Sequence, residues 1–216
     1  MIKFLIFDFD GVICESVGIK TDGFAMLYEG YGQKIKNQVI SHHLSNGGIS
    51  RFKKLQYYHK HFLGLDITKS ELERLMRKFS EFIIDKVIDA PFVKGAHEFL
   101  INHKDEYRMF ISTGTPQEEI ELIVKEKEIN SFFQGVYGSP ENKINHISHL
   151  LKSNVIKRKE TVFIGDSMQD KEAADSTGLT FIARITKNEP SFLKENYRLE
   201  DLSYLDKLLN CINDTI

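Results

Sequence analysis

Short apolar runs alternate with amphipathic stretches along most of the chain. The first run, Ile2 to Phe9, has the length of a buried strand. It ends in acidic residues, and Gly11 follows them. Similar runs end in small or turn-forming residues at 108–112, 135–138, 161–165 and 179–183. Helical patterns lie between them at 95–104, 116–127, 143–152 and 169–177. This alternation predicts an α/β fold, a doubly wound and mostly parallel sheet with helices on both faces.

The stretch from Ser16 to Asp89 interrupts the alternation, because it contains amphipathic helical segments and no convincing buried strand. Its clearest helix begins at Thr68-Lys69-Ser70-Glu71, a capping-box pattern, and carries an apolar stripe typical of core packing. The stripe consists of Leu72, Leu75, Met76, Phe79 and Ile83. We therefore expect an α/β core domain formed by residues 1–15 and 90–216, and an inserted helical domain formed by residues 16–89. The tail is expected to add a short edge strand near Tyr197 and a closing helix over residues 203–212.

Composition narrows the class of partner. The 216 residues are 41% hydrophobic, and the 29 basic and 31 acidic side chains nearly cancel. This balance lacks the basic footprint of a nucleic-acid binder or a polybasic membrane anchor. Two cysteines are too few for a disulfide framework, and Asp8 and Asp10 interrupt the N-terminal apolar run before it could act as a signal or a span. We expect a cytoplasmic monomer or homodimer that acts on a small molecule, with no nucleic-acid or membrane partner.

Two carboxylates mark the end of the first predicted strand. The alternation of side chains along a strand places Asp8 and Asp10 on the same side, and the backbone turns away at Gly11. A hard divalent cation would offset their repulsion, and Mg²⁺ prefers one or two carboxylates together with water and phosphate oxygens. The alternative is that the two aspartates only cap a loop.

Suitable polar groups also follow the later strands. Thr113, Gly114 and Thr115 follow the second strand, Lys143 follows the third, and Asp166 with Asp170 follows the fourth. The carboxyl ends of parallel strands meet in one crevice, where ligands of open α/β sheets bind. Each residue also has an ordinary interpretation: Thr113 as a helix cap, Lys143 as a solvated charge, and the two aspartates as caps of the next helix. Their order and shared location favour a phosphate site.

These four motifs together resemble the haloacid dehalogenase superfamily. Its members carry an Asp-x-Asp-Gly strand end, a strand-terminal Ser or Thr, a Lys, and a Gly-Asp-x-x-x-Asp segment, and all four occur here in order. The insert resembles the helical cap of the subgroup that contains phosphoglycolate phosphatases and β-phosphoglucomutase. Pro91-Phe92-Val93-Lys94-Gly95 resembles the segment that returns from the cap to the core.

The resemblance implies a role for each motif residue. Asp8 would be the nucleophile, and Asp10 would be the general acid and then the general base. Mg²⁺ would be held by Asp8, the carbonyl of Asp10 and Asp166, with Asp170 bonding metal-bound water or a neighbouring ligand. The phosphate would be bound by Thr113 and by the segment of Gly114 and Thr115, while Lys143 would neutralise charge.

The resemblance also extends to the cap. The segment Asn46-Gly47-Gly48-Ile49-Ser50-Arg51 resembles the specificity loop of that subgroup, which implies that Arg51 contacts the distal end of the substrate. Lys20 stands where β-phosphoglucomutase has a histidine, and Gly47 stands where it has a lysine, and both departures argue against a mutase. Lys20 and Arg51 suggest an anionic second group on the substrate, although solvated surface charges explain them equally well. Glu15 replaces a more usual Asp, with no effect that the sequence predicts.

The sequence thus predicts a Mg²⁺-dependent phosphatase that hydrolyses a small phosphorylated metabolite, of the sugar phosphate or phosphoglycolate type, through an aspartyl-phosphate. A phosphomutase is the alternative within the fold, and a non-catalytic phosphoacceptor or metabolite-binding protein is the alternative from another class. Asp10 disfavours a dehalogenase or phosphonate hydrolase, which lack this second acid. The long insert disfavours a receiver-type phosphoacceptor. The histidine spacings do not favour a zinc site, and Cys14 has the character of a packed residue.

Overall fold

A six-stranded, all-parallel sheet forms the centre of the computed structural model, which describes residues 1–185 and 190–215. The strand order is β3-β2-β1-β4-β5-β6, so the chain winds outward from β1 in both directions. This confirms the predicted doubly wound α/β fold. The strands are β1 (Phe4–Phe7), β2 (Arg108–Pro116), β3 (Phe133–Ser139), β4 (Thr161–Gly165), β5 (Thr180–Arg184) and β6 (Arg198–Leu199).

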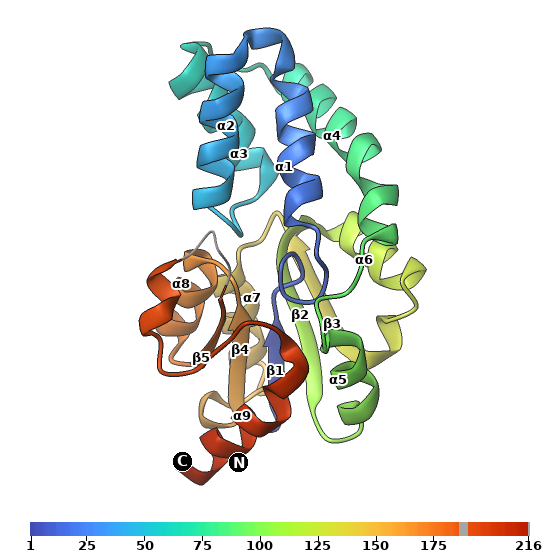
Figure 1. Cartoon of the computed structure of the whole chain (residues 1–216), viewed down its shortest axis with the longest axis vertical. Coiled ribbons are helices and arrows are strands. Elements are labelled where there is room, and N and C mark those ends of the chain that lie inside the picture. The colour runs from blue at the N-terminus through green and yellow to red at the C-terminus, as the bar shows by residue number, and fades with distance from the viewer. Residues whose placement is uncertain (186–189, 216) are drawn as a thin grey trace.

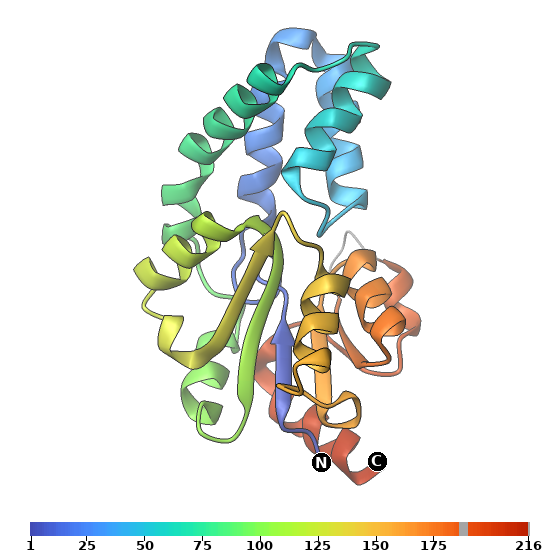
Figure 2. The same ribbon diagram turned by 180° about the vertical axis from the view of Figure 1, so that it is seen from behind.

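Alternation along the central strand builds two hydrophobic layers. Leu5 and Phe7 face a layer that also contains side chains of α5, α6 and α9, whereas Phe4 and Ile6 face a layer with side chains of α7 and α8. Helices therefore cover both faces of the sheet (Figures 1 and 2), which is why the four residues of β1 are all buried. These helices are α5 (Ala96–His103), α6 (Gln117–Glu126), α7 (Lys143–Lys152), α8 (Met168–Thr177) and α9 (Leu205–Thr215).

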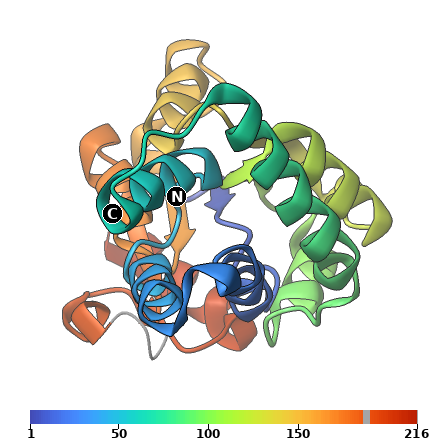
Figure 3. The same ribbon diagram turned by 90° about the horizontal axis from the view of Figure 1, so that it is seen from above.

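The segment between β1 and α5 is helical and stands beyond the carboxyl ends of the strands (Figures 1 and 3). We call residues 16–89 the helical insert. Thr68 caps its longest helix by accepting a hydrogen bond from the Glu71 amide, but the Glu71 carboxylate bonds Arg74, so only half of the predicted capping box is present. The insert contains α1 (Val17–Leu27), α2 (Gln33–Ser45), α3 (Arg51–Tyr58), a π-helical turn (His59–Leu63) and α4 (Lys69–Asp89).

Element boundaries differ from the sequence prediction where pairing or packing decides them. The second strand runs on to Pro116 because that residue still pairs with Ser139 of β3, so Pro116 closes a strand instead of starting a helix. The predicted apolar stripe of α4 is confirmed as packing, with Leu72, Leu75, Phe79 and Ile83 buried and Met76 partly buried. In the tail, β6 lies beside Tyr197 as expected and α9 closes the chain. Residues 186–189 and Ile216, assigned from sequence to the core domain, lie outside the described residues.

No helix in the described ranges is both long enough and apolar enough to cross a bilayer.

Candidate active site

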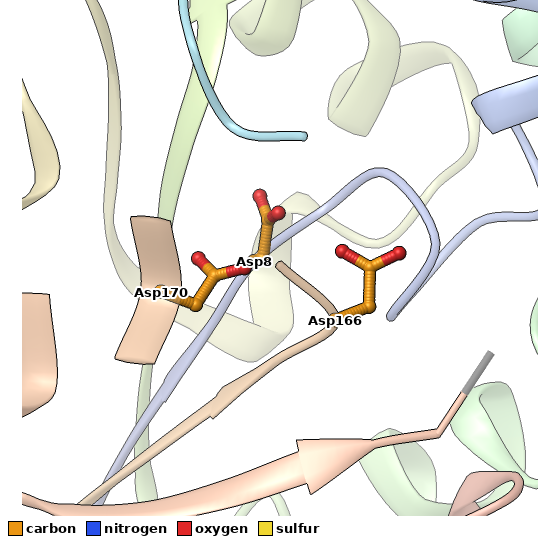
Figure 4. A group of neighbouring side chains, drawn as sticks. All are labelled: Asp8, Asp166 and Asp170. Atoms are coloured by element: carbon orange, nitrogen blue, oxygen red, sulfur yellow. The ribbon is translucent and has the colours of Figure 1, made fainter. Parts of the chain in front are cut away.

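Three aspartates gather where the central strands end (Figure 4). Asp8 follows β1, Asp166 follows β4, and Asp170 lies in the first turn of α8. Because β1 and β4 are paired neighbours, the residues after them emerge side by side. One carboxylate oxygen from each lies within 4.8 Å of the other two. The structure therefore brings these three carboxylates together at one edge of the sheet.

The acidic cluster is short of positive charge. Burial raises the pKa of Asp8 to about 7; the Lys143 ammonium opposes this rise, and the charges of Asp170 and Asp10 add to it. Burial likewise raises the pKa of Asp166 well above its ordinary range, and the charges of Asp8 and Asp170 add to the effect. Hard oxygen ligands that resist ionisation together are relieved by a divalent cation, so the cluster fits Mg²⁺.

Lys143 is a buried cation between two of these acids, and not a solvated surface charge. Its ammonium lies 2.8 Å from Asp8 Oδ2 and 2.5 Å from Asp170 Oδ1. Burial alone would lower the pKa of Lys143, but the two carboxylates raise it, so the side chain stays charged. The second oxygen of Asp170 accepts hydrogen bonds from the amide and hydroxyl of Ser167, which closes a capping box at the start of α8. Asp170 is thus both a helix cap and the residue that orients Lys143.

The turn after β1 depends on a glycine. Gly11 has φ +76°, and a Cβ placed there would lie 2.1 Å from Asp166 Oδ2. Arg184 of β5 donates to the Gly11 carbonyl at 2.7 Å and forms an ion pair with Glu15 at 2.6 Å. Glu15, for which the sequence predicted no effect, therefore helps to connect the turn after β1 to β5 through Arg184.

Asp10 lies outside the acidic cluster and is surrounded by donors. The Ser16 hydroxyl donates to it at 2.6 Å, the Thr115 hydroxyl donates at 3.0 Å, and the Lys20 ammonium forms an ion pair with the same oxygen as Thr115. Burial raises the pKa of Asp10, but Lys20 and the hydroxyl donors outweigh it and hold the pKa below its ordinary value. Asp10 is ionised here, and its carboxylate is bonded to Ser16, Thr115 and Lys20 and not to the three clustered acids.

Thr113 and Gly114 form the wall of the same cavity where β2 meets the insert. Thr113 is buried, and its hydroxyl accepts a hydrogen bond from the Thr115 amide. A Cβ on Gly114 would lie 2.6 Å from the carbonyl oxygen of Gly48, and one on Gly47 would lie 2.8 Å from the Cβ of Ser167. Glycines therefore permit the close approach between the insert loop and the carboxyl ends of the strands.

Arg51 lines the cavity but is not free to bind a second anion in this arrangement. Its guanidinium forms two hydrogen bonds with Glu119 of α6, at 2.9 and 2.5 Å, and a third with Ser80 of α4 at 2.6 Å. It also stacks on the ring of Phe79, 4.4 Å from the centroid. Arg51 thus joins the insert to α6. Lys20, with its ion pair to Asp10, is likewise more than a solvated surface charge.

Two cavity residues were missed in the sequence prediction. His43 of α2 and Lys54 of α3 both line the cavity and are buried. The available signal was spacing, because Lys54 lies one helical turn after Arg51 and shares its face. His43 carried no such signal, because the adjacent histidines His42 and His43 do not share a helical face.

Known structures with the same fold support this arrangement of sheet and insert. β-Phosphoglucomutase from Clostridium difficile has a TM-score of 0.81 at 17% identity, covering 100% of this chain and 99% of its own. A predicted phosphoglycolate phosphatase from Haemophilus somnus 129pt has a TM-score of 0.74 at 18% identity, covering 96% and 98%. A provisionally assigned HAD-hydrolase from Bacillus subtilis, bound to magnesium, has a TM-score of 0.73 at 17% identity, covering 97% and 99%.

At these identities the likeness concerns the fold. The family is shown by the sequence, because residues 5–184 match the model of the haloacid dehalogenase-like hydrolases, and this range includes Asp8, Asp10, Thr113, Lys143 and Asp166. The chain belongs to the haloacid dehalogenase-like hydrolase family.

Proposed function

We propose that this protein is a Mg²⁺-dependent phosphatase that hydrolyses a small phosphorylated metabolite through a phosphoryl group carried on Asp8. The observation that supports this most directly is the position of Asp8. Its buried carboxylate lies between the Lys143 ammonium, the acids Asp166 and Asp170, and a cavity that also contains Asp10. A carboxylate held beside a cation and a second proton-transferring acid is equipped for nucleophilic attack on phosphorus.

The acidic cluster suits a resident magnesium ion. Asp8, Asp166 and the backbone carbonyl of Asp10 are the proposed ligands, and Asp170, whose oxygens already bond Lys143 and Ser167, would act mainly by orientation. When bound, the ion would neutralise charge on the acids and on the transferring group, which is the principal demand of phosphoryl transfer.

The proposed reaction has two half-reactions. Asp8 attacks phosphorus, the bond from phosphorus to the ester oxygen breaks, and protonated Asp10 gives its proton to the leaving alkoxide. Water then attacks the phosphorus of the aspartyl-phosphate, Asp10 takes a proton from that water, and the bond to Asp8 breaks to release phosphate. Thr113, Gly114 and Thr115 would bind phosphate oxygens, while Lys143 would stabilise negative charge. The ionised Asp10 in this structure corresponds to the form required for the second half-reaction.

The helical insert is proposed to act as a cap domain, with residues 1–15 and 90–216 forming the core domain. The contacts that support this are the close approach of Gly48 to Gly114 and the ion pair from Arg51 to Glu119, which place insert groups over the cavity. The cavity is lined by residues of both parts, including Lys20 and Arg51 of the insert and Thr113 and Asp166 of the core. A site covered by a cap in this way limits the access of bulk water and favours small metabolites over phosphoproteins.

The test is hydrolysis of a panel of phosphorylated metabolites in Mg²⁺, with released phosphate as the readout. We expect turnover by the wild type, and its loss in Asp8→Asn or in excess EDTA, because the nucleophile or the charge-neutralising ion is removed. Asp105→Asn is the matched control and should retain activity, because this aspartate is exposed in the connection between α5 and β2. Normal turnover by the Asp8→Asn protein would contradict the assignment, and isomerisation without phosphate release would indicate a mutase.

A further inference from the structure

The cations of the insert differ in whether an acid already neutralises them. Lys20 is paired with Asp10, and Arg51 is paired with Glu119. For Lys54, no carboxylate within residues 1–185 and 190–215 lies inside the 4.0 Å limit of an ion pair. Lys54 nevertheless lines the cavity that contains Asp8.

Lys54 is deeply buried and incompletely bonded. The side chain is only 2% exposed, and its ammonium contacts His43 twice, at 2.8 Å from Nδ1 and at 3.4 Å from the carbonyl oxygen. It also lies 5.7 Å from the centroid of the Phe24 ring. An ammonium has three donors, and the described residues supply no anionic acceptor for them. Burying such a charge without a counter-charge is unfavourable, so the arrangement calls for an anion from outside the chain.

His43 positions the Lys54 ammonium. The side chain is 8% exposed, and burial together with the charge of Lys54 holds the pKa of His43 well below its ordinary value, so the ring is neutral. Because the Lys54 ammonium donates to Nδ1, the ring proton is assigned to Nε2. Nε2 is buried on the far side of the ring from Lys54, so His43 anchors the ammonium through Nδ1 and the remaining donor capacity of Lys54 is left for the cavity.

We propose that Lys54, held in place by His43, binds a carboxylate of the substrate, so that the ester cleaved at Asp8 is the phosphate of a small hydroxy acid. This inference rests on the proposed function, because it assigns a second subsite to the same cavity. Arg51, the residue expected from the sequence to bind a second anionic group, is already paired with Glu119. The proposed site for that group is therefore Lys54, one helical turn further along α3.

Charge favours a carboxylate over a second phosphate. One unpaired ammonium complements the single negative charge of a carboxylate. A second phosphate would bring up to two negative charges to one ammonium. A neutral hydroxyl group would leave the buried charge of Lys54 without a counter-charge.

Phosphoglycolate and ethyl phosphate are the probes, because both are two-carbon alkyl phosphates and only the first has a carboxylate. We expect the wild type to favour phosphoglycolate in kcat/KM. In Lys54→Met, the ratio of the two kcat/KM values should fall about 10- to 100-fold, the effect of losing a charge-assisted hydrogen bond. Each ratio comes from one protein sample, so it does not depend on the fraction that is folded. Lys60→Met, an exposed lysine in the π-helical turn, is the control and should keep the wild-type ratio.

An unchanged ratio in Lys54→Met would overturn the proposal, including when both esters lose activity equally, because that is the signature of a purely structural role. The same comparison can be made without turnover, by calorimetric titration of each ester with Mg²⁺ into the Asp8→Asn protein with and without Lys54→Met. If the wild type hydrolyses neither ester, the metabolite panel decides the proposed function. The titration decides the carboxylate site separately: selective loss of phosphoglycolate binding supports it, and equal binding by both proteins overturns it.

Discussion

Asp10 and Lys54 illustrate how neighbouring groups decide the charge state of a buried ionisable side chain. Both groups are buried in or beside the same cavity. Asp10 has the Lys20 ammonium and two hydroxyl donors, which keep it ionised, whereas Lys54 has only a histidine, so burial lowers its pKa to about 7. The first group is therefore ready for proton transfer, and the second lacks a counter-charge.

Asp10→Asn tests the proton-transfer role. The amide keeps the shape of the side chain and can still accept a hydrogen bond from Ser16 or Thr115, but it cannot cycle a proton. We expect kcat to fall about 10²- to 10⁴-fold, the usual contribution of general acid–base catalysis. Steady-state kinetics on a small ester would measure it, with Asp22→Asn, an exposed aspartate of α1, as the control. A fall below about threefold would rule out Asp10 as the acid and base.

The charge of Lys54 also predicts a pH dependence of substrate choice. Burial and the neighbouring Lys20 together lower the pKa of Lys54 to about 7, against the opposing effect of Asp10. His42 and His43 are the titratable rings nearby. Since the ammonium is lost as pH rises through this pKa, selectivity for phosphoglycolate over ethyl phosphate should decline between about pH 6 and pH 8.5. A bound carboxylate shifts the midpoint upward. The decline should be absent from Lys54→Met, and equal profiles for the two proteins would count against the role.

At the scale of elements, the junction between β2 and the insert loop is built on close backbone contact. Gly114 faces the carbonyl of Gly48, and Arg51 of α3 reaches Glu119 of α6. These contacts join segments that lie far apart in the chain, and they determine how the insert sits over the cavity. The position of the insert over the cavity thus rests on two small residues and one ion pair.

Gly114→Ala tests this junction. Its Cβ would lie 2.6 Å from the Gly48 carbonyl oxygen, so the loop must move outward. We expect kcat/KM to fall about 10- to 100-fold, since a displacement near 1 Å is sufficient for such a loss. Gly30→Ala, where a Cβ meets nothing within 4 Å, is the matched control. Wild-type kinetics in Gly114→Ala would show that this contact is dispensable.

At the scale of the molecule, the acidic cluster should couple stability to pH and to magnesium. The pKa of Asp8 is about 7 in the folded chain and near its ordinary value of 3.8 when unfolded. Between those values the folded state holds more protons, so the stability of the metal-free protein falls as pH rises through this window. Mg²⁺ replaces those protons with a counter-charge, and its stabilising effect must therefore be larger at high pH.

Thermal unfolding at pH 5.5 and pH 8, with and without Mg²⁺, measures this coupling. At saturating metal we expect the Tm to rise by about 5 °C or more at pH 8, and by clearly less at pH 5.5. Asp8→Asn should raise the Tm of the metal-free protein at pH 8 and reduce the metal response, whereas Asp105→Asn should change neither. An equal metal response at both pH values would contradict the coupling.

The limits of sequence-based prediction are clearest at particular residues. The strand ends at Asp8, Thr113 and Asp166 were predictable, because an apolar run followed by polar and small residues is a local signal. The pairing of Arg51 with Glu119 was not, since the two residues come from different parts of the chain and surface charge is common on helices. Lys54 was missed for the same reason: its burial depends on how α1, α2 and α3 pack.

The sequence by itself determined the alternation of strands and helices, the position of the helical insert, and the order of the acidic, hydroxyl and ammonium groups at the strand ends. These follow from periodicity and from the rule that parallel strands share one functional edge. Only the tertiary structure decided which charges are neutralised: Lys20 by Asp10, Arg51 by Glu119, and Lys54 by none of the described residues. The physical reason is that periodicity is a local property of the chain, whereas charge compensation depends on distances between segments that meet only after folding.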